Sequence, residues 1–329
     1  MIGALAVLLA ITCAASGETV QVARVAYLMG TRAMLVAHAE SRSGAVAALE
    51  RVLIALEAAE NDLSTWRETP LNRLNLVPAE TSITLTFDQC ALFDRLNESS
   101  RDTDGAFDPA VGPLIDLWGV QTAARIPPAR AVASALPSAR LAAWSFDATT
   151  CTVRRPKGGR LDSGAFGKGE AIDRAARETA EGEGWLVDLG GQIGVAGTPP
   201  PQGWRIAIAH PQDRARAILE LTLVEGSVST SGGSERDRFV RGARVGHIID
   251  PRTGRPARFD GSVVVWNASG FAADVLSTAL YVMGVEPGLR WAEAHRIAAC
   301  FLVPAHRRVI VRPSSAFAAR FPNLPASVE

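Results

Sequence analysis

The segment from Leu161 to Ala171, LDSGAFGKGEA, is a glycine-rich turn that opens a helix. Gly164, Gly167 and Gly169 let the backbone turn tightly, and Lys168 brings a cation into the turn. Backbone N–H groups at a helix start, beside a lysine, favour an anion such as a phosphate. The spacing matches neither the Walker A motif nor the dinucleotide fingerprint GxGxxG. A structural turn with an exposed lysine is the alternative interpretation.

Patterns on both sides of this turn predict interleaved strands and helices. Residues 20–38 form two strands interrupted at Met29-Gly-Thr31, and 43–63 form an amphipathic helix. Further strands are expected at 149–154, 185–189, 204–209, 218–224, 263–266, 300–303 and 309–311, and further helices at 168–180, 271–283, 287–295 and after the capping box Thr86-x-x-Gln89. Sequential hairpins outnumber βαβ units. The predicted fold is therefore α+β, one domain with a mixed, largely antiparallel sheet and packed helices.

Two further segments fall between the predicted helices and strands. Residues 72–75 are predicted to lie in a polar loop. Residues 121–140, rich in alanine, proline and arginine, are predicted to be a surface excursion.

The composition is that of a globular protein with ample material for a core. Hydrophobic residues make up 47% of the 329 residues and charged residues 21%. Lysine plus arginine and aspartate plus glutamate number 34 each, which excludes the basic field expected of a nucleic-acid-binding protein. The four cysteines are widely spaced without a CxxC pair, so they predict neither a zinc site nor a recognisable disulfide framework.

The first residues of the chain resemble a targeting segment. Residues 2–16 are apolar and small, and residues 15–17 offer small side chains for cleavage, so 1–17 are expected to be an export signal. The apolar run is too short to span a membrane comfortably, and it lacks a basic start. Cys13 gives the alternative of a lipoprotein leader. We expect an exported protein of the periplasm or cell envelope, and lipidation at Cys13 would anchor it to the inner membrane.

Three oxygen-bearing side chains share one face of the helix predicted at 271–283. Asp274, Ser277 and Thr278 are three and four residues apart, so their oxygens point the same way. Mg²⁺ prefers such oxygen ligands and often completes its shell with water and substrate phosphates. This face predicts a metal site that bridges to a phosphate. A polar face toward solvent or a cap is the alternative.

His247 lies inside a dense polar turn motif and is a candidate general base. A packed histidine at a strand end is the alternative. Asp108 and Asp162 follow apolar segments and are candidates either for accepting a ligand hydrogen bond or for capping a turn. Residues 229–231 are hydroxyl-rich but have no identifiable base, and the chain contains neither GxSxG nor HExxH.

Taken together, these segments resemble the FAD:protein FMN transferases, the ApbE family. The resemblance is carried in chain order by Met29-Gly-Thr31, Leu63-Ser-Thr-Trp66, Gly105-Ala-Phe-Asp-Pro-Ala-Val-Gly-Pro-Leu114, Leu117-Trp-Gly119, Leu161-Asp162 to Lys168-Gly169, Leu189-Gly-Gly191, Thr230-Ser-Gly232, His247-Ile-Ile-Asp-Pro-Arg-Thr-Gly-Arg-Pro256 and Ala273-Asp274 to Thr278. It implies a single ApbE-like, T-fold-like domain over residues 18–329.

The resemblance also implies an activity and a site. Family members are Mg²⁺-dependent and transfer FMN from FAD, through a phosphoester bond, to a Thr or Ser hydroxyl of a partner protein, with release of AMP. The residues implied at the FAD site are Met29, Trp66, Ala106, Phe107, Asp108, Asp162, Lys168 and Ile249. The implied metal ligands are Ala165, through its carbonyl, with Asp274, Ser277 and Thr278. His247 falls at the position of the candidate general base.

Several positions depart from the family pattern. The family usually has Tyr at Trp66, Thr at Ala110 and Tyr at Ser234. On either side of the Gly190-Gly191 pair it usually has Asn, where this chain has Asp188, and Asp or Asn, where this chain has Gln192. None of these changes removes the implied metal ligands or base. Two other functions fit the same residues. One is an FAD pyrophosphatase that releases FMN and AMP, and the other is a non-catalytic flavin-binding protein of the cell envelope. The implied partners are FAD and an acceptor protein, not nucleic acid.

Overall fold

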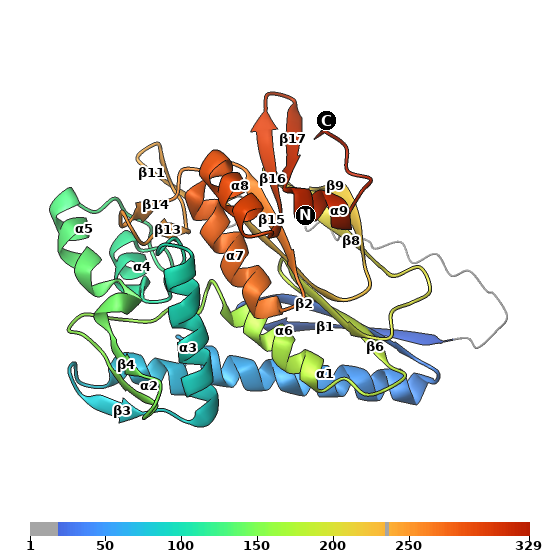
Figure 1. Cartoon of the computed structure of the whole chain (residues 1–329), viewed down its shortest axis with the longest axis horizontal. Coiled ribbons are helices and arrows are strands. Elements are labelled where there is room, and N and C mark those ends of the chain that lie inside the picture. Colours follow the sequence, from blue (N-terminus) through green and yellow to red (C-terminus); the bar gives the residue numbers. More distant parts are fainter. Residues whose placement is uncertain (1–18, 234–236) are drawn as a thin grey trace.

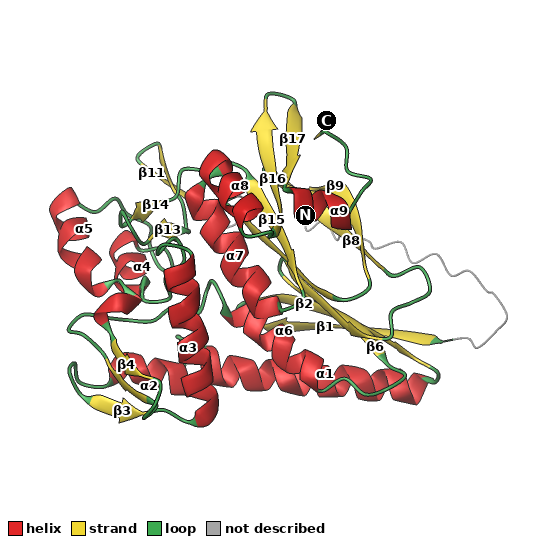
Figure 2. Ribbon diagram, viewed as in Figure 1, coloured by secondary structure: helices red, strands yellow, loops and turns green. Residues whose placement is uncertain are grey.

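The computed structural model describes residues 19–233 and 237–329. The predicted leader, residues 1–17, and the departing position Ser234 lie outside these described residues. Within them the chain forms the predicted α+β fold (Figures 1 and 2). The tight turn at Met29-Gly30 joins the first two strands as expected, because both residues adopt the positive φ angles (50° and 72°) that a two-residue hairpin turn requires.

In the described part of the chain the largest sheet has nine strands, and every neighbouring pair is antiparallel. Their spatial order is β1 (Val20–Leu28), β2 (Thr31–Ala39), β6 (Gly184–Leu189), β7 (Gln192–Gly197), β10 (Gly226–Gly232), β15 (Ser262–Asn267), β16 (Ala298–Ala305), β17 (Arg308–Pro313) and β18 (Ser327–Val328). Smaller sheets are formed by β3 (Ser82–Thr84), β4 (Ser145–Asp147) and β5 (Thr152–Arg154), by β8 (Trp204–His210) and β9 (Asp213–Leu223), by β11 (Arg238–Val240) and β12 (Ala243–Val245), and by β13 (Ile249–Asp250) and β14 (Arg255–Pro256).

Helices of the described chain pack around this sheet. They are α1 (Arg42–Leu63), α2 (Pro70–Leu76), α3 (Phe87–Asp102), α4 (Gly112–Trp118), α5 (Ala129–Ala135), α6 (Gly167–Arg177), α7 (Gly270–Met283), α8 (Val285–Ala294) and α9 (Ser315–Arg320). The capping box predicted at Thr86 is confirmed, with Thr86 and Gln89 bonded reciprocally at the start of α3. Within these described residues, no helix combines the length and apolar character needed to cross a membrane.

The central strand β15 explains how the sheet is covered on both faces. Successive side chains of a strand point to opposite faces. Val263 and Val265 pack with α7 and α8, whereas Val264 packs with the apolar side of the β8–β9 hairpin. All three valines are fully buried. Helices therefore cover one face of this part of the sheet, and a hairpin covers the other.

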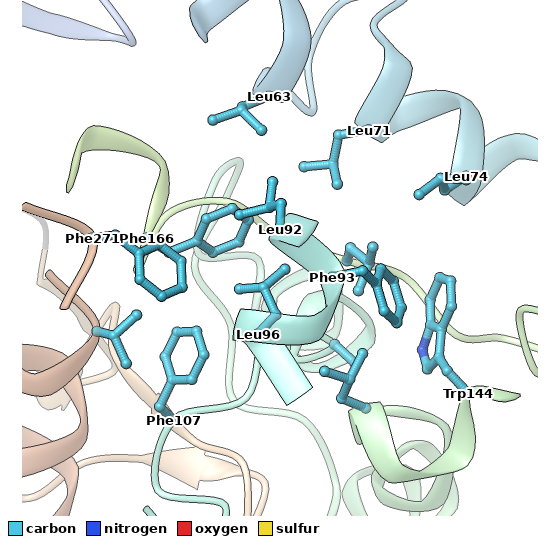
Figure 3. Packing of buried hydrophobic residues seen from close by; sticks show 14 of the residues in the cluster. Leu63, Leu71, Leu74, Leu92, Phe93, Leu96, Phe107, Trp144, Phe166 and Phe271 are labelled. Carbon is cyan, nitrogen blue, oxygen red and sulfur yellow. The ribbon is translucent and has the colours of Figure 1, made fainter. Parts of the chain in front are cut away.

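A separate hydrophobic cluster joins α2, α3 and the β3–β5 sheet to the helices α6 and α7. Figure 3 shows Phe107, Phe166 and Phe271 gathered beside Leu96 of α3. Phe166 is fully buried and its ring centroid lies 6.3 Å from that of Phe271. Phe166 directly precedes α6, so its burial in this cluster anchors the glycine-rich turn to the hydrophobic core.

One sequence expectation about a loop is wrong. Residues 72–75 belong to α2, which begins at Pro70 behind the cap Thr69 and buries Leu71 and Leu74 three residues apart. The segment 121–140 lies mostly at the surface as expected, and it contains the short helix α5, whose Val132 is buried against α4. In both cases a helix of about two turns presents too few apolar residues for its period to stand out.

The cysteine expectation is also wrong. Cys90 of α3 and Cys151 before β5 form a disulfide with their Cα atoms 5.4 Å apart, across a sequence separation of 61 residues. Cys300 is free and buried. Nothing local in the sequence pairs two single cysteines so far apart, because the pairing follows from how α3 packs on the small sheet.

We expect removal of this disulfide to destabilise the fold without changing it. Replacing Cys90 and Cys151 together by serine should lower the free energy of unfolding by about 2–4 kcal/mol, because a long loop of the unfolded chain is no longer closed. Chemical denaturation of both proteins, with and without a reducing agent, measures the difference. The reducing agent should affect only the parent protein. Identical unfolding midpoints in all four experiments would contradict this expectation.

Candidate active site

One cleft of about 870 Å³ collects nearly all the residues that the sequence singled out. A volume of this size is typical of pockets for large ligands. Its walls come from the β1–β2 turn, the segments after α1 and α3, the glycine-rich turn, the β8–β9 hairpin, β10, the start of β13 and α7. The predicted residues that line it are Met29, Trp66, Ala106, Phe107, Asp108, Asp162, Ala165, Lys168, His247, Ile249, Asp274 and Thr278. Ser277 alone of the predicted set does not line it.

The helices α6 and α7 bring the glycine-rich turn and Asp274 together. Gly169 of α6 and Gly270 of α7 lie so close that a Cβ atom on Gly169 would stand 2.1 Å from the carbonyl oxygen of Gly270. Asp173 of α6 accepts hydrogen bonds from the backbone N–H groups of Gly270 and Phe271, at 2.5 and 3.1 Å. It thereby caps the start of α7. The two helices are thus joined where the site is built.

Asp274 of α7 is a buried carboxylate that lies against the start of α6. It is 2% exposed and accepts a hydrogen bond from the Gly169 N–H at 3.0 Å. The Lys168 ammonium lies 3.6 Å from its other oxygen and is partly exposed toward the cleft. Burying a carboxylate is costly unless a cation or several donors balance it. A carboxylate held in this way, at the floor of a cleft, is suited to a cation.

Other oxygen-bearing groups line the cleft together with this carboxylate. Thr278 lines the cleft beside Asp274, together with Ala165 of the glycine-rich turn. Ser277 is fully buried, and its hydroxyl is within 2.9 Å of Ser229 and 2.8 Å of Ser231, which places it behind the cleft and against β10. One carboxylate with hydroxyl and carbonyl oxygens fits a hard cation such as Mg²⁺ that takes further oxygens from phosphate and water. In residues 19–233 and 237–329 no group of three His, Cys, Asp or Glu side chains offers another kind of metal site.

Asp108 and Asp162 both organise the backbone of the cleft wall. Asp108 Oδ1 accepts from the N–H groups of Ala110 and Leu141, each at 2.9 Å. Asp162 accepts from the Gly164 N–H at 2.9 Å and from the Gln121 side chain at 2.8 Å. The structure therefore assigns both carboxylates the capping role that the sequence left open, while both remain at the cleft surface.

Burial raises the pKa of Asp108 from 3.8 to about 6, and hydrogen bonds from Leu141, Ala110 and Ser100 oppose the rise. The folded state then binds more protons than the unfolded chain between about pH 4 and pH 6. We expect the free energy of unfolding to fall across this range as pH rises, by up to about 3 kcal/mol. Asp108→Asn should remove this contribution. Urea unfolding of both proteins from pH 4 to pH 7 tests it, and parallel pH profiles would contradict it.

Apolar side chains and the β1–β2 turn form another part of the cleft lining. Met29 has a positive φ angle of 50°, which is uncommon for a residue with a Cβ, and it lines the cleft. Trp66 is 68% exposed at the cleft surface, whereas Ala106 and Phe107 are each 1% exposed. A broad exposed indole beside buried apolar groups is suited to a flat ring system.

His247 stands at the cleft with a carboxylate behind it. Its backbone N–H and its Nδ1 both lie 2.9 Å from Oδ1 of Asp237. The His247 side chain is 19% exposed and the Asp237 side chain 8%. Asp237 was missed from the sequence, because it precedes His247 by ten residues in a polar ribbon with no periodic pattern.

Other polar residues of the cleft were also missed. The β8–β9 hairpin contributes His210 and Arg214, and the end of β6 contributes Asp188. Burial raises the pKa of the Asp188 carboxyl, while a hydrogen bond from Gly191 and the charges of Arg214 and Lys168 oppose the rise. The alternation of β8 and β9 predicted the hairpin but not that its turn would reach the cleft.

Comparisons with known proteins agree with this geometry. Residues 29–301 match the model of the ApbE family. An FAD:protein FMN transferase of Vibrio cholerae is 30% identical over 257 residues, which cover 75% of this chain and 77% of that protein. A protein of the same name from Rhodobacter capsulatus is 32% identical over 79% of this chain, but the match spans only 51% of its own length.

Solved structures give the same result for the fold. The ApbE protein of Thermotoga maritima superposes with a TM-score of 0.83 at 26% identity, covering 92% of this chain and 99% of that one. The flavinyl transferase ApbE of Pseudomonas stutzeri gives a TM-score of 0.80 at 28% identity, covering 93% and 98%. Since the family model matches most of the chain and these structures share its whole architecture, the protein belongs to the ApbE family.

Proposed function

We propose that this protein is an FAD:protein FMN transferase. It cleaves the pyrophosphate of FAD and transfers FMN to a Thr or Ser hydroxyl of an acceptor protein. The observation that carries the proposal is the meeting of Asp274, Lys168 and His247 in one cleft large enough for a dinucleotide. The names of the relatives support the same reaction.

The reaction needs no reactant besides FAD and the acceptor hydroxyl, because one P–O bond forms and one breaks. The acceptor oxygen forms a new bond to the FMN phosphorus, and the bond from that phosphorus to the AMP oxygen breaks. His247 accepts the hydroxyl proton, and the Lys168 ammonium at the start of α6 balances the phosphate charge. Mg²⁺ held by Asp274, Thr278 and the Ala165 carbonyl would supply Lewis acidity at the pyrophosphate. AMP leaves with the bridging oxygen.

The direct test is incubation of the purified protein with FAD and Mg²⁺, with and without an acceptor protein that carries a flavinylation-type Thr. AMP release, the mass of the acceptor and its fluorescence in a gel are measured together. AMP formed only alongside an acceptor heavier by one FMN supports the transferase. AMP and free FMN without labelling would replace it by an FAD pyrophosphatase, and no product would leave a flavin-binding protein.

We also propose that the protein works outside the cytoplasm, in the periplasm or cell envelope. The disulfide between Cys90 and Cys151 supports this, because such bonds persist in oxidising compartments. The apolar start of the sequence supports it too. Fractionation of cells and mass measurement of the envelope-bound protein test the proposal and distinguish a cleaved signal from a lipid anchor on Cys13. A full-length protein found only in the cytoplasm would refute it.

A further inference from the structure

The β11–β12 hairpin closes a carboxylate onto the candidate base. Arg238 of β11 pairs with Val245 of β12, so the pairing brings Asp237, which directly precedes β11, close to His247, which lies two residues after β12. The two 2.9 Å contacts from Asp237 Oδ1 to the backbone N–H and to Nδ1 of His247 follow from this closure. One carboxylate oxygen of Asp237 thereby contacts both the backbone and the imidazole of His247.

The charge state of Asp237 decides which nitrogen of His247 carries the proton. Burial alone would raise the pKa of Asp237, but hydrogen bonds from His247 and Arg244 outweigh it and hold this pKa below its usual range. Its Oδ2 accepts from Arg244 Nε at 2.6 Å, and Arg244 also pairs with Asp260. An ionised carboxylate only accepts hydrogen bonds, so the proton of a neutral His247 lies on Nδ1.

The second ring nitrogen of His247, Nε2, is available to accept a proton. No residue of the described chain forms a hydrogen bond with Nε2 of His247, and the side chain lines the cleft. With the proton fixed on Nδ1, the lone pair of the neutral imidazole is on Nε2. When Nε2 takes a proton, the positive ring has the Asp237 carboxylate 2.9 Å behind it. That contact stabilises the positively charged imidazole that proton transfer produces.

We propose that Asp237 is a positioning residue that fixes the Nδ1-protonated tautomer of His247, so that Nε2 receives the proton of the acceptor hydroxyl. The inference rests on the proposed function for its catalytic consequence, and on the geometry alone for the tautomer. Asp237 does not line the cleft and touches no reacting atom, so its effect passes through His247.

The test uses Asp237→Asn in the full protein with FAD, Mg²⁺ and the acceptor. Asparagine keeps the size of the side chain but can donate to Nδ1 and so stabilise the other tautomer. We expect kcat for transfer to fall by about 10²-fold or more, with the KM for FAD unchanged within about twofold. Asp260→Asn is the matched control, because it removes the other carboxylate of Arg244 without a contact to His247, and its kcat should stay near that of the parent.

A tautomer measurement separates this role from a merely structural one. In protein labelled with ¹⁵N-histidine, the His247 signals are assigned by their loss in His247→Gln. They should report a proton on Nδ1 in the parent and in Asp260→Asn, and on Nε2 in Asp237→Asn. Adding Asp237→Asn to His247→Gln should cost no further activity, since the pair acts as a unit.

Each result bears on the inference in one direction. An unchanged tautomer in Asp237→Asn, an unchanged kcat, or a further large loss in the double variant would overturn it. Failure of the proposed function has a different signature, because the parent protein would then yield neither AMP nor labelled acceptor. The tautomer measurement would still decide the role of Asp237 in that case.

Discussion

Replacing Asp274 by alanine is expected to abolish metal-dependent turnover while the protein stays folded. The carboxylate is the one acidic group among the candidate metal ligands, and its loss leaves only neutral oxygens for a divalent cation. Turnover of FAD should fall by about 10³-fold or more, because the metal would stabilise charge that develops on the phosphates. AMP release at saturating Mg²⁺ measures the effect.

Binding of the metal can be followed independently of activity. Mg²⁺ should raise the melting temperature of the parent protein, because a ligand that binds only the folded state stabilises it. Asp274→Ala should lose this shift and keep a native circular dichroism spectrum. Asp88→Ala, at the exposed start of α3, is a control that should keep both the shift and the activity. Full activity in Asp274→Ala would show that the metal is not held here.

Replacing His247 by alanine should slow transfer far more than it weakens FAD binding. General base catalysis contributes about 10²–10⁴-fold to a rate, so kcat for transfer should fall within this range. The dissociation constant for FAD should change by less than about threefold, because the contacts proposed between Lys168 and the pyrophosphate remain. Single-turnover labelling of the acceptor and a separate FAD titration give the two numbers.

The control for this variant is an exposed histidine that does not line the cleft. His295 follows the end of α8, where its Nδ1 lies 2.8 Å from the Trp291 carbonyl oxygen. His295→Ala should transfer FMN at the parental rate. If His247→Ala instead lost FAD binding and transfer in equal measure, His247 would be a structural residue of the polar turn.

The parts of the fold that the sequence predicted are those with a strong local signal. The helix start at Thr86 has two polar groups that satisfy one another, and the Met29-Gly30 turn joins two β-rich runs. For α7, the three- and four-residue spacing of Asp274, Ser277 and Thr278 predicted that these side chains share one face of the helix. These features depend on residues within one or two turns of each other, so no tertiary knowledge is needed.

The parts that it did not predict depend on distant neighbours. The short helix α2 is stabilised by burying Leu71 and Leu74 against the α3 cluster, and the disulfide depends on the same packing. Within the site, Ser277 shares a helical face with Asp274 but meets β10 rather than the cleft. Periodicity gives the face of a helix, but only the fold decides which neighbour that face meets.

Asp237 illustrates the same limit for chemistry. Ten residues separate it from His247, and only the register of β11 with β12 brings them together. Arg244, which balances Asp237, is likewise one arginine among several in this segment of the sequence. The family resemblance gave the histidine, and the structure supplied its partner.

The contact between Gly169 and Gly270 sets a boundary for engineering this enzyme. Laboratory evolution toward other nucleotides or acceptors can vary the side chains of the cleft wall, which face open space. The two glycines allow no such choice, because any Cβ at Gly169 meets the backbone of α7 and the Cβ of Asp274. A mutant library should therefore keep both glycines and vary residues of the β8–β9 hairpin and the β1–β2 turn. Substitutions there can change substrate selectivity while the spacing of α6 and α7 is kept.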